Sequence, residues 1–271
     1  MNKRNILWRL LGYASVGLLV LFMIPRFFID RFIYFPEAHH EFRPDDFKLP
    51  YEDISLTTDD GVKLHAWWIG DHSMRKTVLF FHGNAGNISH RLDRINLLGQ
   101  PKIRFFLLDY RGYGQSQGKP SEEGFYRDAT AVYQYLRAQS VSPENIFLFG
   151  ESLGGAVATE LATRVPIAGL ILESTFTSVR GIASIHYPFI PNAFVPDQFN
   201  SMARISNVHA KLLVIHGNQD EIAPFSMGKH LYETANQPKS FLEIPGAGHN
   251  DLYLVGGRPY RKQILRFLEI N

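Results

Sequence analysis

The sequence predicts an α/β protein built on a doubly wound, mostly parallel β-sheet, and three observations support this prediction. Short apolar runs recur along the chain and end in turn-forming residues. Stretches with apolar residues at helical spacing separate these runs, which is the alternation expected of a doubly wound sheet. The runs are continuously apolar, as is typical of strands whose two faces are both covered.

Six apolar runs are predicted to be the strands of this sheet. They are residues 77–81, 103–109, 145–149, 168–173, 211–215 and 239–244. Before them, residues 52–58 and 62–69 flank the turn signal at residues 59–61. The sequence therefore also predicts a hairpin at the start of the sheet.

Helical patterns lie between the predicted strands. They are carried by Ile88, Leu92 and Ile95, by Phe125, Ala129, Val132 and Leu136, and by residues 153–165. Ser121 precedes the second pattern as a candidate N-cap, followed by two glutamates in the first turn.

The stretch 176–209 breaks this rhythm, because it is long and rich in proline and aromatic residues. It is predicted to be a short lid inserted into the sheet domain. The lid side chains that could line an acyl pocket are His186, Tyr187, Phe189, Ile190, Phe194 and Val195. The sequence is equally consistent with a lid that only covers the core.

Composition excludes several classes of function. The chain has 28 basic and 26 acidic residues, of which seven and five fall in the first 48, so the rest carries 21 of each. A body without excess charge argues against nucleic-acid binding. The chain has no cysteine, so disulfides and thiolate chemistry are excluded.

Residues 6–24 are apolar except for Arg9 and have about the length that a helix needs to cross a bilayer. We expect residues 1–30 to be a single-pass transmembrane anchor and residues 31–271 to form the α/β domain. A cleaved signal peptide is disfavoured because no small-residue cleavage site follows, and a buried core helix is the other alternative. Basic residues before the segment favour a cytoplasmic N-terminus, with the domain on the opposite side. The aromatic and basic residues 26–35 are expected to lie at the membrane interface.

A nucleophile motif follows the strand predicted at 145–149. Residues 150–154 read Gly-Glu-Ser-Leu-Gly, and a helical pattern begins at Leu153. Glycines on both sides permit the sharp turn that would present the Ser152 hydroxyl above the sheet. The N-terminus of the following helix offers N–H groups to a developing oxyanion.

A serine nucleophile needs a base and an acid, which in this motif follow in the order serine, acid, histidine. Asp220 comes after the strand at 211–215, and His249 comes after the last predicted strand. Asp251 is the rival acid, but it follows the histidine. We therefore predict a catalytic triad of Ser152, Asp220 and His249.

The oxyanion hole is predicted from the loop after the first parallel strand. There, residues 80–87 read Phe-Phe-His-Gly-Asn-Ala-Gly-Asn, and the N–H groups of Asn84 and Leu153 are the candidate donors. A phosphate-binding loop is the alternative, but neither common glycine-rich nucleotide motif is present.

In order and spacing, these segments resemble the α/β-hydrolase superfamily. The segments are residues 80–87, 109–118, 150–155, 216–224 and 246–251. Within it, residues 35–270 are most similar to small membrane-anchored serine hydrolases, the bud-emergence-suppressor-like branch related to protein depalmitoylases. The resemblance implies the α/β-hydrolase fold, the same triad, ester or thioester substrates and no cofactor.

The sequence therefore predicts a membrane-anchored serine hydrolase that acts on acyl esters or thioesters, such as acyl lipids or lipidated proteins. A peptidase of the same fold, a non-catalytic binding protein and a membrane-shaping protein remain the alternatives. Serine at position 152 disfavours dehalogenase-type relatives, which would carry aspartate there.

Overall fold

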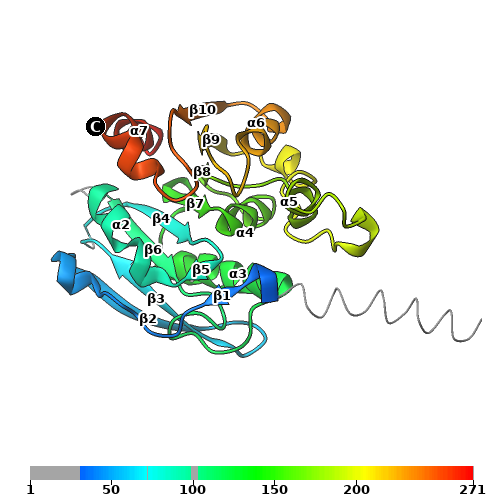
Figure 1. Cartoon of the computed structure of the whole chain (residues 1–271). Coiled ribbons are helices and arrows are strands. Elements are labelled where there is room, and N and C mark those ends of the chain that lie inside the picture. Colours follow the sequence, from blue (N-terminus) through cyan, green and yellow to red (C-terminus); the bar gives the residue numbers. More distant parts are fainter. Residues whose placement is uncertain (1–30, 72, 99–102, 271) are drawn as a thin grey trace, which may run out of the picture.

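The computed structural model describes residues 31–71, 73–98 and 103–270. Its main sheet has eight strands in the order β10-β9-β8-β7-β4-β6-β3-β2 (Figure 1). The strands are β2 (Tyr51–Thr57), β3 (Lys63–Ile69), β4 (Lys76–Phe81), β6 (Ile103–Leu108), β7 (Ile146–Glu151), β8 (Gly169–Glu173), β9 (Lys211–Gly217) and β10 (Lys239–Ile244). From β6 to β10 all pairings are parallel, and β3 pairs antiparallel with β2 and β6. The predicted parallel sheet and hairpin are confirmed.

Helices cover both faces of the sheet. They are α2 (Leu92–Leu98), α3 (Glu122–Ala138), α4 (Leu153–Ala162), α5 (Val179–His186), α6 (Phe225–Thr234) and α7 (Leu252–Phe267). Side chains of α3, α4 and α6 share one core cluster, and those of α2 and α7 share the other. In β4, Leu79 and Phe81 face the first cluster, while Val78 and Phe80 face the second. The continuously apolar strand therefore fills two cores at once.

The predicted helices are present with small differences in length. Ser121 caps α3 by accepting a hydrogen bond from Gly124 N at 3.1 Å. Helix α4 ends at Ala162, three residues before the predicted end. The sequence analysis did not predict α6 and α7. The periodicity of α7 is interrupted by a non-helical residue, Gly257, and by Pro259.

The order of the strands reverses between β4 and β7. The chain goes from β4 to β6 on one side and then returns past β4 to β7 on the other. Ligands of open α/β sheets bind at such a switch point, beyond the carboxyl ends of the strands. The loops after β4 and β7 carry the predicted oxyanion donor and the predicted nucleophile.

The predicted lid has two parts. Helix α5 and the loop after it project from the body of the domain (Figure 1). The second part returns to the core, where Phe199, Ile205 and Val208 are buried. The first part is therefore largely exposed, and the second part packs into the domain.

Within the described ranges, no helix is both long and apolar enough to cross a bilayer. The predicted transmembrane segment, residues 6–24, lies outside those ranges. The anchor and its orientation therefore remain predictions.

Candidate active site

Ser152 occupies a strained turn between β7 and α4. Its backbone angles, φ 52° and ψ −115°, are rarely adopted by a residue with a side chain. A Cβ at Gly150 would lie 2.4 Å from the Gly154 oxygen, and a Cβ at Gly154 would lie 2.0 Å from the Phe81 oxygen. Ser152 N donates to the backbone carbonyl oxygen of Glu173 at 2.9 Å, so the end of β8 holds the turn in place.

The structure brings Ser152, His249 and Asp220 together from three different loops. His249 Nε2 lies 3.0 Å from Ser152 Oγ, within hydrogen-bond distance. His249 Nδ1 lies 2.8 Å and 3.0 Å from the two carboxylate oxygens of Asp220. With the Nδ1 proton donated to Asp220, Nε2 is free to accept the serine proton.

The Asp220 carboxylate is buried and fixed by its own loop. Its Oδ1 accepts hydrogen bonds from Ile222 N at 2.9 Å and Ala223 N at 2.8 Å. Burial alone would raise the pKa of Asp220, but contacts with His216 and His249 outweigh burial and lower it. Asp220 is therefore ionised at neutral pH and favours the Nδ1-protonated form of His249.

Asp251 has a different environment from Asp220. Its Oδ1 accepts a hydrogen bond from Gly248 N at 2.7 Å. It also stands at the N-terminal end of α7. These contacts hold the loop that carries His249 and do not involve its imidazole ring.

Asn84 and Leu153 line the same pocket as Ser152. Leu153 is the first residue of α4, so its N–H is not used within the helix. The loop after β4 approaches the nucleophile closely, because a Cβ at Gly83 would lie 3.5 Å from Ser152 Cβ. Both predicted donors are therefore beside the serine.

Residues 31–35, part of the segment predicted to lie at the membrane interface, also hold the Asn84 loop. Phe35 N donates to the backbone carbonyl oxygen of Asn84 at 3.0 Å, and Asn84 Nδ2 donates to the backbone carbonyl oxygen of Ile33 at 3.0 Å. Two residues of this segment form β1 (Phe35–Pro36), which pairs with β5 (Ala85–Gly86). We call residues 31–43 the strap. The sequence contained no periodic signal for this pairing, because each strand has only two residues.

The pocket above Ser152 has a volume of about 590 Å³ and is mainly apolar. This is within the usual range for small-molecule sites. The strap forms one wall and the lid forms another. The apolar residues around it are Phe32, Ile33, Phe35, Leu153, Phe176, Val179, Ile182, Ala183, Tyr187, Ile190, Val195 and Ile222. Of the six lid residues named from the sequence, His186, Tyr187, Ile190 and Val195 line it.

A buried charge cluster lies beneath the serine turn. One nitrogen of Arg94, on α2, lies 3.0 Å from Glu151 and 2.7 Å from Glu173. Burial would raise the pKa of Glu151, but Arg91 and Arg94 outweigh burial and lower it to about 2. Tyr260 OH donates to Glu173 at 2.6 Å, so α7 joins the cluster. The sequence analysis did not identify these residues.

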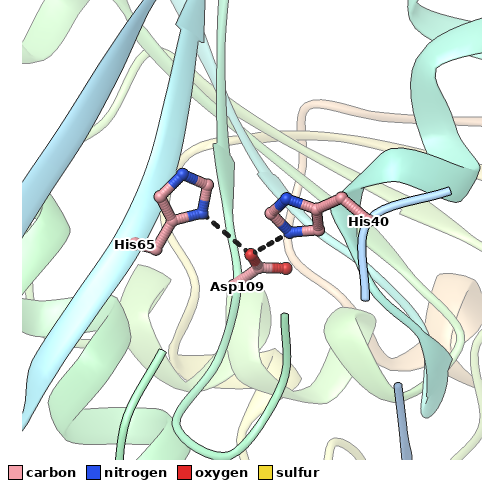
Figure 2. A group of neighbouring side chains, drawn as sticks. All are labelled: His40, His65 and Asp109. Carbon is pink, nitrogen blue, oxygen red and sulfur yellow. Dashed lines mark hydrogen bonds and ion pairs between the residues drawn. The ribbon is translucent and has the colours of Figure 1, made fainter. Parts of the chain in front are cut away.

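A second polar cluster joins the strap to the sheet (Figure 2). His40 Nε2 and His65 Nδ1 lie 2.7 Å and 2.9 Å from the same oxygen of Asp109. Among the described residues, this is the group whose atoms are close enough to hold one metal ion. Zinc would need the ligand atoms to separate to about 3.3 Å, given bonds of about 2.0 Å. The observed spacing is that of direct hydrogen bonds.

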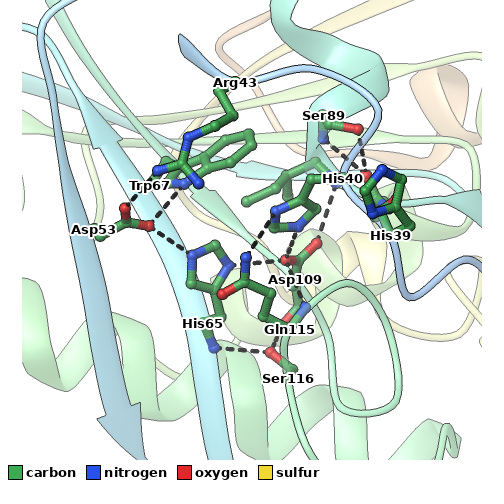
Figure 3. Close-up of polar contacts among 12 residues, drawn as sticks. His39, His40, Arg43, Asp53, His65, Trp67, Ser89, Asp109, Gln115 and Ser116 are labelled. Carbon is green, nitrogen blue, oxygen red and sulfur yellow. Dashed lines mark hydrogen bonds and ion pairs between the residues drawn. The ribbon is translucent and has the colours of Figure 1, made fainter. Parts of the chain in front are cut away.

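The wider network explains the state of His65 (Figure 3). Its Nε2 lies 2.8 Å from Asp53, which also accepts from Trp67 Nε1 at 2.9 Å. Both nitrogens of His65 thus face carboxylates, an arrangement that requires two protons on the ring. Burial alone would lower the pKa of His65, but the contacts with Asp109 and Asp53 outweigh burial and raise it. The cluster is therefore an ion-paired clamp between the strap, β3 and the end of β6.

Comparisons with known proteins agree with this fold. The family described as serine aminopeptidase, S33, matches residues 72–197. An uncharacterised protein of Mycobacterium tuberculosis is 40% identical over 242 residues, covering 88% of this chain and 86% of that protein. The alpha/beta hydrolase domain-containing protein WAV2 of Arabidopsis thaliana is 36% identical over 284 residues, covering 94% and 90%.

The fold is also found among solved structures. An esterase of Pyrococcus furiosus superposes with a TM-score of 0.72 at 23% identity, covering 88% of this chain and 97% of that chain. The protein belongs to the α/β-hydrolase superfamily. The predicted membership of this superfamily is confirmed.

Proposed function

We propose that the protein is a serine hydrolase that cleaves esters or thioesters with an apolar acyl group. The supporting observation is the alignment of Ser152, His249 and Asp220 at an apolar pocket, with 3.0 Å between Ser152 Oγ and His249 Nε2. The esterase among the structural neighbours is consistent with this proposal. The pocket would hold the acyl chain, as its apolar walls suggest.

The reaction proceeds in two halves. His249 Nε2 accepts the Ser152 proton while Oγ attacks the acyl carbonyl carbon. The N–H groups of Asn84 and Leu153 stabilise the oxyanion. His249 then donates its proton to the leaving alcohol or thiol, which leaves an acyl ester on Ser152. Water, deprotonated by His249, attacks this ester and releases the carboxylic acid.

Ser152→Ala tests the assignment of the nucleophile. We expect hydrolysis of p-nitrophenyl esters to fall by at least about a thousandfold, because loss of a triad nucleophile leaves only the oxyanion hole and binding. Circular dichroism of the variant checks the fold, and a fluorophosphonate probe should label the wild type alone. Wild-type turnover by Ser152→Ala would exclude Ser152 as the nucleophile.

The acyl specificity can be tested by filling the pocket. Ala183, on α5, lines it, so Ala183→Phe should shorten the acyl chain that fits. We expect a series of esters graded by chain length to lose its long members, while the acetyl ester keeps its rate. An unchanged chain-length profile would place the acyl group elsewhere.

A peptidase is the second candidate, because the matched family is described as a serine aminopeptidase. Glu221 lines the pocket and could pair with the amino group of a peptide. Aminoacyl p-nitroanilides in the same series separate the two functions. Faster cleavage of these amides than of acyl esters would favour the peptidase.

A further inference from the structure

The mouth of the active-site pocket is bordered by exposed apolar side chains. Phe32, Phe35, Tyr187, Ile190 and Ile222 line the pocket and are between 37% and 74% exposed. Phe189 is 78% exposed, and its ring centroid lies 6.2 Å from that of Tyr187. We call these six residues the apolar rim. Soluble surfaces seldom gather large apolar side chains around one opening, so the rim indicates a contact site.

Three segments far apart in the sequence build this rim. The strap contributes Phe32 and Phe35, the loop after β9 contributes Ile222, and the loop after α5 contributes Tyr187, Phe189 and Ile190. In Figure 1 the first described residues and this loop lie on the same side of the molecule. The pocket that they share shows that they meet around one opening.

The chain that precedes the rim indicates what the rim contacts. Residues 6–24 are apolar except for Arg9, and they end eight positions before Phe32. A segment of this length and composition partitions into lipid. As an anchor, it would hold the strap end of the rim close to a membrane surface.

We propose that the apolar rim docks on a lipid bilayer, so that the pocket opens onto the acyl region of the membrane. Glu221 is the one carboxylate among the residues that line the pocket. The lining contains no lysine or arginine, so docking is proposed to depend on apolar contact and not on anionic headgroups, and zwitterionic phosphatidylcholine should suffice.

Docking also gives a route for substrate, a consequence that rests on the proposed function. An acyl group that left the bilayer through water would expose its apolar surface, which is unfavourable. A mouth pressed against the bilayer lets the group pass from lipid into an apolar pocket. The apolar walls of the pocket and the rim then form one continuous surface.

Site-specific labelling tests docking without relying on activity. The chain has no cysteine, so Phe189→Cys in the full-length protein carries a single environment-sensitive fluorophore. The matched control is Glu144→Cys. Glu144 is exposed and precedes β7, so it lies at the opposite end of this strand from Ser152. In phosphatidylcholine vesicles, the label at 189 should shift to shorter wavelengths and be quenched by brominated acyl chains. The label at 144 should respond to neither.

Three results would overturn docking. The first is a label at 189 that remains in a water-like environment on vesicles. The second is equal quenching at 189 and 144. The third is a shift at 189 that grows with protein concentration but is not quenched by brominated lipid, which would assign the rim to a second copy of the chain.

A kinetic measurement separates docking from chemistry. Phe189 does not line the pocket, so Phe189→Ser should leave the rate on a soluble short ester unchanged. On a long-chain ester embedded in the same vesicles we expect a loss of roughly tenfold, about the effect of removing one large apolar contact. Equal loss on both substrates would contradict docking. If the wild type cleaves neither substrate, the proposed function fails, and quenching at 189 still decides whether the rim docks.

Discussion

At the scale of single residues, Asp220 and Asp251 show how environment separates two similar carboxylates. Asp220 contacts the His249 ring and accepts two N–H bonds from its own loop. Asp251 accepts a backbone N–H from Gly248. Asp220 is therefore placed to orient the histidine, and Asp251 is placed to support its loop.

This difference predicts that two matched substitutions reduce kcat by very different amounts. In Asp220→Asn the side-chain NH₂ would face His249 Nδ1 and favour the wrong tautomer, so kcat should fall by about four orders of magnitude. Asp251→Asn keeps an acceptor for Gly248 N and should cost far less. The measurement is kcat on one soluble ester at one pH, with circular dichroism as the folding control. A nearly active Asp220→Asn beside an inactive Asp251→Asn would reverse the roles.

The raised pKa of His65 predicts that the stability of the fold depends on pH. Its folded pKa is raised, so its stabilising contribution is complete below its unfolded value of about 6.5 and is lost as pH rises through the folded pKa. His82 affects stability over a lower range of pH, because burial lowers its pKa to about 4. Stability from His82 is lost as pH falls from about 6.5 toward 4.

The variant His65→Gln tests the contribution of His65 to stability. The variant should be less stable than the wild type at pH 6, and the difference should shrink as pH rises above about 6.5. Urea unfolding at several pH values measures this difference. A difference that stays constant across the range would mean that His65 does not titrate with the clamp.

At the scale of elements, the buried charges tie α2 and α7 to the ends of β7 and β8. Glu151 and Glu173 are the last residues of these two strands, and Arg94 reaches both of them from α2. The serine turn begins immediately after Glu151. The cluster therefore supports the segment that presents the nucleophile.

Removal of the shared cation should destabilise the fold. Arg94→Met leaves Glu173 without its guanidinium in a buried site, so we expect a loss of about 3–5 kcal/mol in the free energy of unfolding. Adding Glu173→Gln should restore part of this loss, because the amide removes the unpaired charge. Urea denaturation measures both variants, with the exposed Arg266→Met as control. Equal stability of Arg94→Met and Arg266→Met would contradict the role of the cluster.

Sequence reasoning identified the elements with strong local signals. Apolar runs and turn residues are recognised from a few neighbouring residues. Ser152, Asp220 and His249 were each placed by the predicted strand that precedes them, and their order along the chain completed the prediction. The strap and the buried charges depend on contacts between distant segments. His40 and Asp109 are 69 positions apart, and Arg94 and Glu151 are 57 apart. No local pattern specifies such pairs, because their partners are chosen by the tertiary fold.

At the scale of the whole molecule, the strap connects the N-terminal segment to the site. It follows the predicted anchor, forms a wall of the pocket, and holds the Asn84 loop through backbone hydrogen bonds. The clamp at His40 fixes its far end to Asp109. The start of the described chain and the geometry of the proposed oxyanion hole are therefore physically connected.

The last prediction separates a spanning anchor from surface docking. If residues 6–24 cross the bilayer, the full-length protein should stay with membranes after alkaline carbonate extraction, which removes proteins held only by their surface. Leu18→Arg with Val16→Arg should release it, because each arginine at the centre of a span costs about 2.5–3.5 kcal/mol. Leu18→Ile is the matched control and should remain in the membrane fraction. A soluble mature chain that begins after residue 24 would instead establish a cleaved signal peptide, and membrane attachment would then depend on the apolar rim alone.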